Sequence, residues 1–225
     1  MLDYEKERRK REAKTPKRII NFFGEEKTDF IFFLSYILNF KYRRKVLVID
    51  NTKKNILKMI VGVDEQDRLS RKKNIVYKLD GSEYEPSLLR DYDIILNFVG
   101  FNIDLDKEYI NSRYSHSMVI TNMQKDAVSR CRKLIHALDN EIDLIITDCV
   151  ECGVSVGNVL FDLRYKVEKN IQKNFCLCRD VNTYREFIKL QYGQNVVWEN
   201  LSMDMDELLY YMAGLVVPDR VNKKG

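Results

Sequence analysis

The stretch RIINFFGEEKTDFIFFLSYILNFKYRRKVLVIDN, residues 18–51, predicts a strand, a tight turn, a helix and a second strand, in that order. In many nucleotide-binding proteins the first turn of such a unit holds a phosphate group. The turn here is GEEKT, residues 24–28, which begins with glycine and ends with Lys-Thr, as a phosphate-binding loop does. Two glutamates stand where glycines are expected. The turn is therefore a working phosphate loop, a degenerate one or an unrelated turn.

The rest of the chain continues the alternation of strands and helices. Short apolar runs with isoleucine and valine are typical of strands that are covered on both faces. Such strands are predicted at residues 18–23, 45–50, 74–79, 93–99, 117–122, 143–147 and 174–178. Helices are predicted at residues 29–40, 52–59, 126–138, 156–170, 182–192 and 204–215. This order predicts an α/β fold with a doubly wound, mostly parallel sheet of about seven strands and helices on both faces.

The composition fits one large domain with a sizeable core. The chain has 225 residues, of which 45% are hydrophobic and 32% are charged. The net charge of +4 is weak support for a polyanionic partner, so we do not expect nucleic acid binding. We predict a charged extension at residues 1–17, the α/β domain at residues 18–217 and a short tail at residues 218–225.

The sequence predicts a cytoplasmic protein. Its longest apolar run, residues 30–40, is too short to span a bilayer, which needs about 20 residues. The charged N-terminus does not fit a signal peptide. Pro218 interrupts the tail, so we do not expect direct membrane anchoring, and a partner would have to recruit the protein to a membrane.

The five cysteines raise the question of a zinc site. Cys149-x-x-Cys152 and Cys176-x-Cys178 supply four thiols, and four thiolates suit tetrahedral zinc. However, strand alternation places Cys176 and Cys178 on one face, and buried cysteines commonly act as small apolar residues. We therefore expect reduced cysteines and no metal.

In the order of its motifs the chain resembles the MinD/ParA group of P-loop ATPases, which carry a deviant Walker A motif. The family pattern is G-K-G-G-V-G-K-T, then a helix, VLLIDAD and a strand ending in YDYIIID. The matching runs are GEEKT at 24–28, VLVIDNT at 46–52, YDIILNF at 92–98, ITNMQKDAVSRCRKLI at 120–135 and LIITDCVECGVSVGNVL at 144–160. The likeness covers about residues 18–217 and implies a P-loop NTPase fold.

The resemblance also implies which residues form a nucleotide site. Gly24, Lys27 and Thr28 fall on the phosphate loop. Asp50 falls on a carboxylate that in the family lies near the attacking water and Mg²⁺. Asn97 falls on the Walker B aspartate. Asp180 falls in a later segment of the family's nucleotide site.

Two departures from the family pattern predict that this site is vestigial. The family has five residues between the first glycine and the lysine, whereas only Glu25 and Glu26 separate Gly24 from Lys27. Three missing residues remove up to about 10 Å of chain, so backbone N–H groups cannot surround a phosphate in the family's way. Asn97 supplies no charge for Mg²⁺, which prefers anionic oxygens. We therefore expect no catalytic residues and no bound cofactor.

The resemblance implies a role in spatial positioning. We expect a noncatalytic scaffold or regulator that helps position or assemble a cellular machine, such as a pilus, a flagellum, a secretion system, the division site or a plasmid. Its partner would be a protein of that system, and the chain would pair with itself or with an active paralogue. Phe30, Phe33 and Ile37 of the apolar helix are candidates for an uncovered dimer surface.

Two alternatives remain open from the sequence. One is an unusual ATPase that holds ATP and Mg²⁺ through Lys27, Thr28 and Asp50. The other is a DNA-binding partition protein, which salt-sensitive binding to duplex DNA would reveal.

Overall fold

The computed structural model describes residues 18–52, 56–61, 69–72, 74–78, 91–101, 115–138, 140–164 and 171–217. These residues form one sheet with the strand order β3-β4-β2-β5-β1-β6-β7-β8. The strands are β1 (Arg18–Gly24), β2 (Val46–Asp50), β3 (Leu69–Lys72), β4 (Ile75–Lys78), β5 (Ile94–Gly100), β6 (Ser115–Asn122), β7 (Ile142–Cys149) and β8 (Ile171–Cys178). The predicted extension and tail lie outside the described residues.

The sheet confirms the predicted architecture and adds one strand to it. All seven predicted strands are present, and each of them pairs in parallel with its neighbours among the seven. The eighth strand, β3, runs antiparallel to β4 at one edge of the sheet. Its sequence, LSRK, has no apolar run, which is why the pattern of apolar residues did not predict it.

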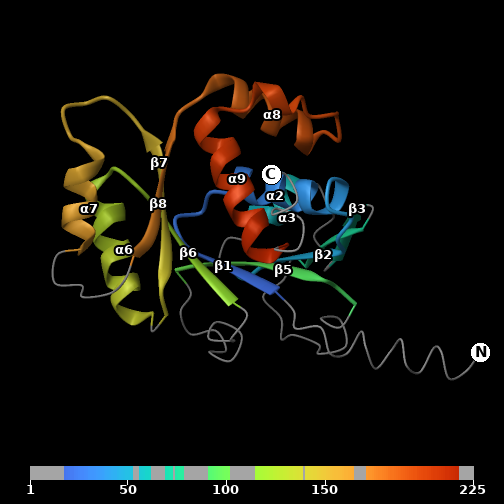
Figure 1. Ribbon diagram of the computed structural model, residues 1–225, viewed down its shortest axis with the longest axis horizontal. Helices are drawn as coiled ribbons and strands as arrows, with labels where there is room; N and C mark the ends of the chain where they lie inside the picture. The colour runs from blue at the N-terminus through green and yellow to red at the C-terminus, as the bar shows by residue number, and fades with distance from the viewer. Residues whose placement is uncertain are drawn as a thin grey trace, which may run out of the picture.

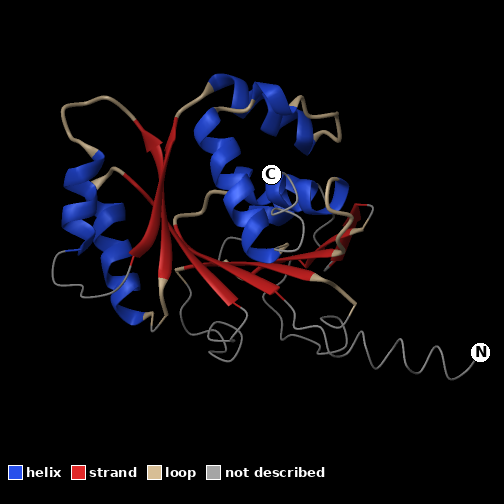
Figure 2. Ribbon diagram, viewed as in Figure 1, coloured by secondary structure: helices blue, strands red, loops and turns tan. Residues whose placement is uncertain are grey.

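Helices cover both faces of the sheet (Figure 1, Figure 2). One face packs against α2, α3, α8 and α9, and the other against α6 and α7. Their bounds, with the 3₁₀ helix η1, are α2 (Asp29–Phe40), α3 (Ile56–Val61), α6 (Lys125–Ala137), α7 (Val156–Arg164), α8 (Val181–Gln191), η1 (Trp198–Asn200) and α9 (Met203–Val216). None of the described helices is long and apolar enough to cross a membrane.

The strands are apolar along their whole length because both of their faces are buried. In β1, Ile20 and Phe22 pack on the side of α2 and α9, while Ile19 and Phe23 pack on the opposite side. Burying such a side chain contributes about 1.5–3 kcal/mol. Parallel strands also bring their carboxyl ends to the same edge of the sheet, where ligand sites of open α/β sheets form.

Helix α2 lies in the core, although Ile37 is only partly buried. Its sequence, DFIFFLSYILNF, is apolar nearly all round, and Phe30 and Phe33 are fully buried between the sheet, α8 and α9. Phe33, for example, packs against Phe187 of α8 and Trp198 of η1. The expectation that Phe30 and Phe33 are uncovered is therefore wrong, because α8 and α9 fold back over this helix.

Candidate functional site

The turn after β1 can be formed only by glycine. Gly24 has a φ of +92°, and a Cβ atom on it would lie 2.2 Å from the carbonyl oxygen of Ile120 on the neighbouring strand β6. The next residue, Glu25, donates its backbone N–H to that same oxygen at 2.9 Å. Gly24 therefore has a structural role that requires no ligand.

Three of the backbone N–H groups at the turn and at the start of α2 are bonded to acceptors within the chain. Besides Glu25, Lys27 donates its N–H to the carbonyl oxygen of Glu25 at 2.9 Å. Phe30 donates its N–H to the carboxylate of Asp29 at 3.0 Å. A phosphate loop works because successive N–H groups point into one concavity at a helix N-terminus. Here three of those groups have protein acceptors.

A carboxylate of the chain occupies the N-terminal end of α2, where the positive end of the helix dipole favours an anion. Thr28 is the N-cap residue and is buried, but its side chain makes no capping hydrogen bond. Asp29 lies in the first turn instead and accepts from Phe30. Burial raises the pKa of the Asp29 carboxyl, and the charge of Lys27 opposes that rise.

Internal ion pairs hold both charged ends of the turn. Lys27 Nζ lies 3.1 Å from Asp148 Oδ1, at the end of β7. Glu25 Oε1 lies 2.7 Å from an Arg130 guanidinium nitrogen, and Arg130 also binds Asp126 at 2.7 Å on α6. The lysine that would reach a phosphate is therefore bound to a carboxylate of the protein.

Asp50 is a structural residue in this arrangement. It is fully buried, and its Oδ1 accepts from the backbone N–H of Thr52 at 2.9 Å and from the Thr52 hydroxyl at 2.6 Å. Its Oδ2 accepts from the N–H of Leu57 at 2.9 Å. The carboxylate thus connects the end of β2 to α3, and both of its oxygens are engaged by the chain.

Asn97 belongs to a row of amides that crosses the centre of the sheet. Its Oδ1 accepts from Asn51 Nδ2 at 2.7 Å, and its own Nδ2 donates to Asn21 Oδ1 at 2.8 Å. All three side chains are buried. An ionised aspartate at this position could accept from Asn51 but could not donate to Asn21. The amide at position 97 therefore fits this row.

Lys27 and Asp180 meet at one hollow of about 420 Å³, which we call the edge hollow. It lies at the carboxyl ends of β7 and β8, and Asp29, Asp148 and Arg179 also line it. Asp180 is the N-cap of α8 and accepts from the Thr183 N–H at 2.6 Å, which lowers the pKa of its carboxyl. Asp50 and Asn97 do not line the edge hollow.

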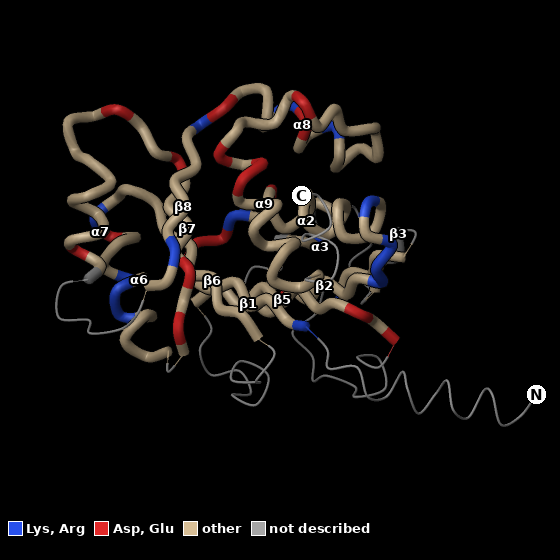
Figure 3. Tube along the Cα trace, viewed as in Figure 1, with Lys and Arg blue, Asp and Glu red and all other residues tan. Residues whose placement is uncertain are grey.

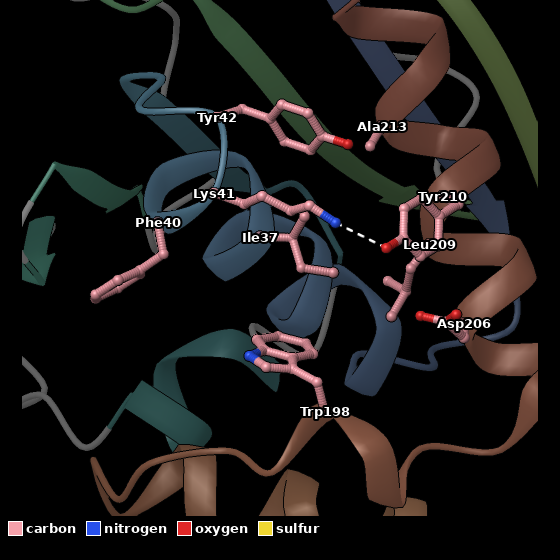
Figure 4. Close-up of a pocket in the computed structure, with 9 residues that line it drawn as sticks. All are labelled: Ile37, Phe40, Lys41, Tyr42, Trp198, Asp206, Leu209, Tyr210 and Ala213. Carbon is pink, nitrogen blue, oxygen red and sulfur yellow. Dashed lines mark hydrogen bonds between the residues drawn. The ribbon is translucent and has the colours of Figure 1, made fainter. Parts of the chain in front are cut away.

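A second hollow, of about 210 Å³, lies between the end of α2, η1 and α9 (Figure 4). Its walls are mainly apolar and aromatic and include Ile37, Tyr42 and Trp198. Lys41 crosses it and donates from Nζ to the Tyr210 hydroxyl at 2.7 Å, and this hydrogen bond raises the pKa of Lys41. None of the nucleotide-site residues expected from the sequence lines this hollow.

Four of the five cysteines lie in or near the ends of β7 and β8, and Cys131 lies in α6. The Cα atoms of Cys149 and Cys178 are partners across the two strands. Cys149 is buried, and burial raises the pKa of its thiol to about 12. Within the described part of the chain, no group of three histidine, cysteine or acidic residues is arranged to hold a metal ion.

Glu186 is a structural acid that the sequence did not indicate. It lies on the inner face of α8 and is fully buried. Its carboxylate accepts from Lys189 Nζ at 2.7 Å, from the Val197 N–H at 2.9 Å and from Asn200 Nδ2 at 2.9 Å. These contacts fix α8, one wall of the edge hollow, to the segment that follows it.

Glu186 is expected to make the stability of the protein depend on pH in the acid range. Its hydrogen bonds, first that from Lys189, lower the pKa of its carboxyl from the usual 4.5 to about 2. A lowered pKa contributes stability above the unfolded value of 4.5, and this stability is lost as the pH falls from there toward 2. Glu186→Gln should cost about 2 kcal/mol at pH 7 and flatten the loss of stability below pH 4.5. Urea unfolding between pH 7 and pH 3 measures both effects.

The exposed Glu199 provides the matched control for this prediction. Glu199→Gln should leave both the stability at neutral pH and its acid dependence as in the unaltered protein. An acid profile of Glu186→Gln that superimposes on that of the unaltered chain would contradict the assigned role.

Comparison with known proteins concerns the fold. No family model matches this sequence, and a search of curated proteins found no match. Among solved structures, the MinD cell division protein of Aquifex aeolicus is similar, with a TM-score of 0.60 and 16% identity over 88% of this chain and 97% of that chain. The MinC:MinD cell division protein complex of the same organism gives a TM-score of 0.60 and 15% identity, over 88% of this chain and 96% of that chain.

Two further structures extend the similarity across the same group. A complex of Cyanothece McdA with ATP matches with a TM-score of 0.59 and 12% identity, over 89% of this chain and 96% of that chain. A ParA family ATPase from Chlorobium tepidum TLS matches with a TM-score of 0.56 and 12% identity, over 87% of this chain and 98% of that chain. The chain therefore has the α/β fold of the MinD and ParA ATPases along nearly its whole described length.

Proposed function

We propose that this protein is a noncatalytic scaffold or regulator of the MinD/ParA type, which helps to position or assemble a cellular machine through protein contacts. Its solved neighbours include a cell division protein and that protein in complex with MinC. In this role the protein keeps docking surfaces of the MinD/ParA type but has no switch driven by a nucleotide. The partner is a protein of the positioned system, the site of action is the cytoplasm, and any membrane attachment is supplied by the partner.

The bond between Lys27 and Asp148 carries this proposal. A nucleotide would have to break that pair, whose atoms lie 3.1 Å apart, before the lysine could reach a phosphate. The phosphate would then face the carboxylates of Asp148 and Asp29 across the edge hollow. A carboxylate about 4 Å from a phosphate charge costs about 4 kcal/mol at an effective dielectric constant of about 20. The N–H groups of Glu25, Lys27 and Phe30 already have acceptors within the chain and do not offset that cost.

Neither alternative gains support from the site. The ATPase alternative needs Asp50 beside Lys27, whereas both Asp50 oxygens accept hydrogen bonds from Thr52 and Leu57. The DNA-binding alternative needs a basic face. Over the described residues, Lys and Arg are interspersed with Asp and Glu and do not gather on one side of the trace (Figure 3).

Calorimetric titration with Mg-ATP is the test of the proposed function. Because Lys27, Asp29 and the N–H group of Glu25 have internal partners, we expect no binding at micromolar nucleotide and no ATP hydrolysis. Asn97→Asp should not create either activity, since the turn would remain short and acidic. A micromolar dissociation constant that Lys27→Ala abolishes, and that the exposed control Lys125→Ala leaves unchanged, would overturn the proposal.

A further inference from the structure

The outer face of α8 is apolar although no described element covers it. The exposed residues of this helix are Val181, Asn182, Tyr184, Arg185 and Ile188, and Tyr192 follows at its end. Val181, Tyr184, Ile188 and Tyr192, which we call the α8 stripe, recur at intervals of three and four residues and so lie along one side. Val181, Tyr184 and Tyr192 are 72%, 63% and 80% exposed.

The fold does not need this stripe. Helix α8 already buries its opposite side, where Phe187 packs against Phe32 and Phe33 of α2. The start of the helix is fixed by the Asp180 cap, and its middle is bonded to the following segment through Glu186. The α8 stripe is therefore a rigid apolar surface on a helix whose packing is complete without it, and such surfaces mark sites of interaction.

The exposed charged residues on α8 and just before it are arginines. Arg179, just before the helix, is 83% exposed, and its Nε lies 3.8 Å from Asp148 Oδ1. Arg185 lies within the exposed face and donates to the side chain of Asn182, and no carboxylate among the described residues pairs with it. The exposed positions of α8 include no acidic residue. The stripe thus combines apolar side chains with guanidinium groups and calls for a ligand that is both apolar and acidic.

The two ends of the chain, residues 1–17 and 218–225, lie outside the described residues and have the wrong charge to cover this surface. Residues 1–17 contain seven basic and four acidic residues, and residues 218–225 contain three basic residues and one acidic residue. A second copy of the protein would bring arginine against arginine. Charge complementarity therefore favours a different, acidic partner.

We propose that the α8 stripe is the docking site for an amphipathic helix of a partner protein, with apolar residues along one seam and acidic residues beside it. This inference rests on the proposed function, because it identifies the surface through which the scaffold binds its partner. A helix packs on another through side chains spaced three and four residues apart, which is the spacing of the stripe. Val181 and Tyr184 also line the edge hollow, so the docked helix would lie beside it.

The probes for this proposal are two synthetic helical peptides of about 18 residues, long enough to cover the roughly 17 Å of the stripe. Both carry the same leucine seam, but one has glutamate and the other lysine at the flanking positions. Fluorescence anisotropy with the full chain, without nucleotide, should show the acidic peptide binding about tenfold more tightly than the basic one. Added salt should reduce that difference.

Surface variants then locate the binding site. Replacing Val181, Tyr184 and Ile188 together by serine should weaken the acidic peptide about tenfold or more. Arg185→Glu should remove or reverse the preference for the acidic peptide. Val150→Ser changes an apolar residue after β7 that is 53% exposed, and it should have no effect. All of these side chains are exposed, so the variants should fold, and circular dichroism checks this.

Three results would overturn the docking site: no binding of either peptide, equal binding of both, or binding that the serine variant retains. Light scattering that shows a dimer lost in the serine variant would assign the stripe to a second copy instead. Because the peptides are tested without nucleotide, a micromolar affinity for Mg-ATP would refute the noncatalytic function separately and would leave the peptide result as measured.

Discussion

Gly24→Ala is expected to destabilise the protein by more than about 4 kcal/mol, which is among the largest effects of a single methyl group. The new Cβ would lie 2.2 Å from the backbone oxygen of Ile120, and the φ of +92° is one that L-amino acids rarely adopt. The neighbour is backbone in the middle of a sheet, so it cannot move away cheaply. The midpoint of thermal unfolding should fall by roughly 8 °C or more, measured by circular dichroism, and soluble yield should fall with it.

Gly193→Ala separates the two causes of this loss. Gly193 also has a positive φ, +70°, but a Cβ there would meet no atom within 4 Å. Only the backbone strain remains, so the expected cost is about 1 kcal/mol and a shift of a few degrees. Equal shifts in the two variants would show that the contact with Ile120 is not the cause.

Asp50→Ala is expected to cost about 3–5 kcal/mol, because it leaves buried donors without their charged acceptor. The N–H groups of Thr52 and Leu57 and the Thr52 hydroxyl all bind this carboxylate. The thermal midpoint should fall by roughly 10 °C. The exposed Asp126, which pairs with Arg130 in the next turn, is the control, and Asp126→Ala should leave the thermal midpoint nearly unchanged because surface ion pairs contribute little.

The two roles suggested for Asp50 predict different results. If Asp50 is a structural residue, the Asp50→Ala variant is less stable than the unaltered protein, and neither protein hydrolyses ATP. A catalytic residue would give a variant as stable as the unaltered protein in which ATP hydrolysis disappears. The second result would contradict the role assigned here.

The parts of the fold that depend on apolar burial could be predicted from sequence. Seven strands followed from runs such as VLVID in β2, because strands covered on both faces must be apolar throughout. The sequence correctly predicted the position of helix α2. It did not predict which elements pack over this helix, because a helix that is apolar all round does not show which of its sides faces another element. The polar edge strand β3 carried no apolar signal at all.

The sequence supplied candidate positions for a site but not the contacts that those residues make. Gly24, Lys27 and Asp180 were identified as candidates, and the structure places Lys27 and Asp180 at the same hollow. Their partners were not predictable, because the pairs of Lys27 with Asp148 and of Glu25 with Arg130 join residues more than 100 positions apart. Asp148 has no local motif, and only its place at the end of β7 brings it to the lysine.

The amide row at the centre of the sheet has a consequence for folding. Asn21 and Asn97 stand opposite each other on β1 and β5, two strands that are otherwise almost wholly apolar. Between such strands a misaligned pairing shifted by two residues would bury similar side chains and would be hard to distinguish from the native one. In that pairing Asn97 would face Ile19 or Phe23, and each stranded amide would cost about 1–3 kcal/mol. We therefore expect the three asparagines to disfavour shifted pairings of β1 and β5 relative to the native one.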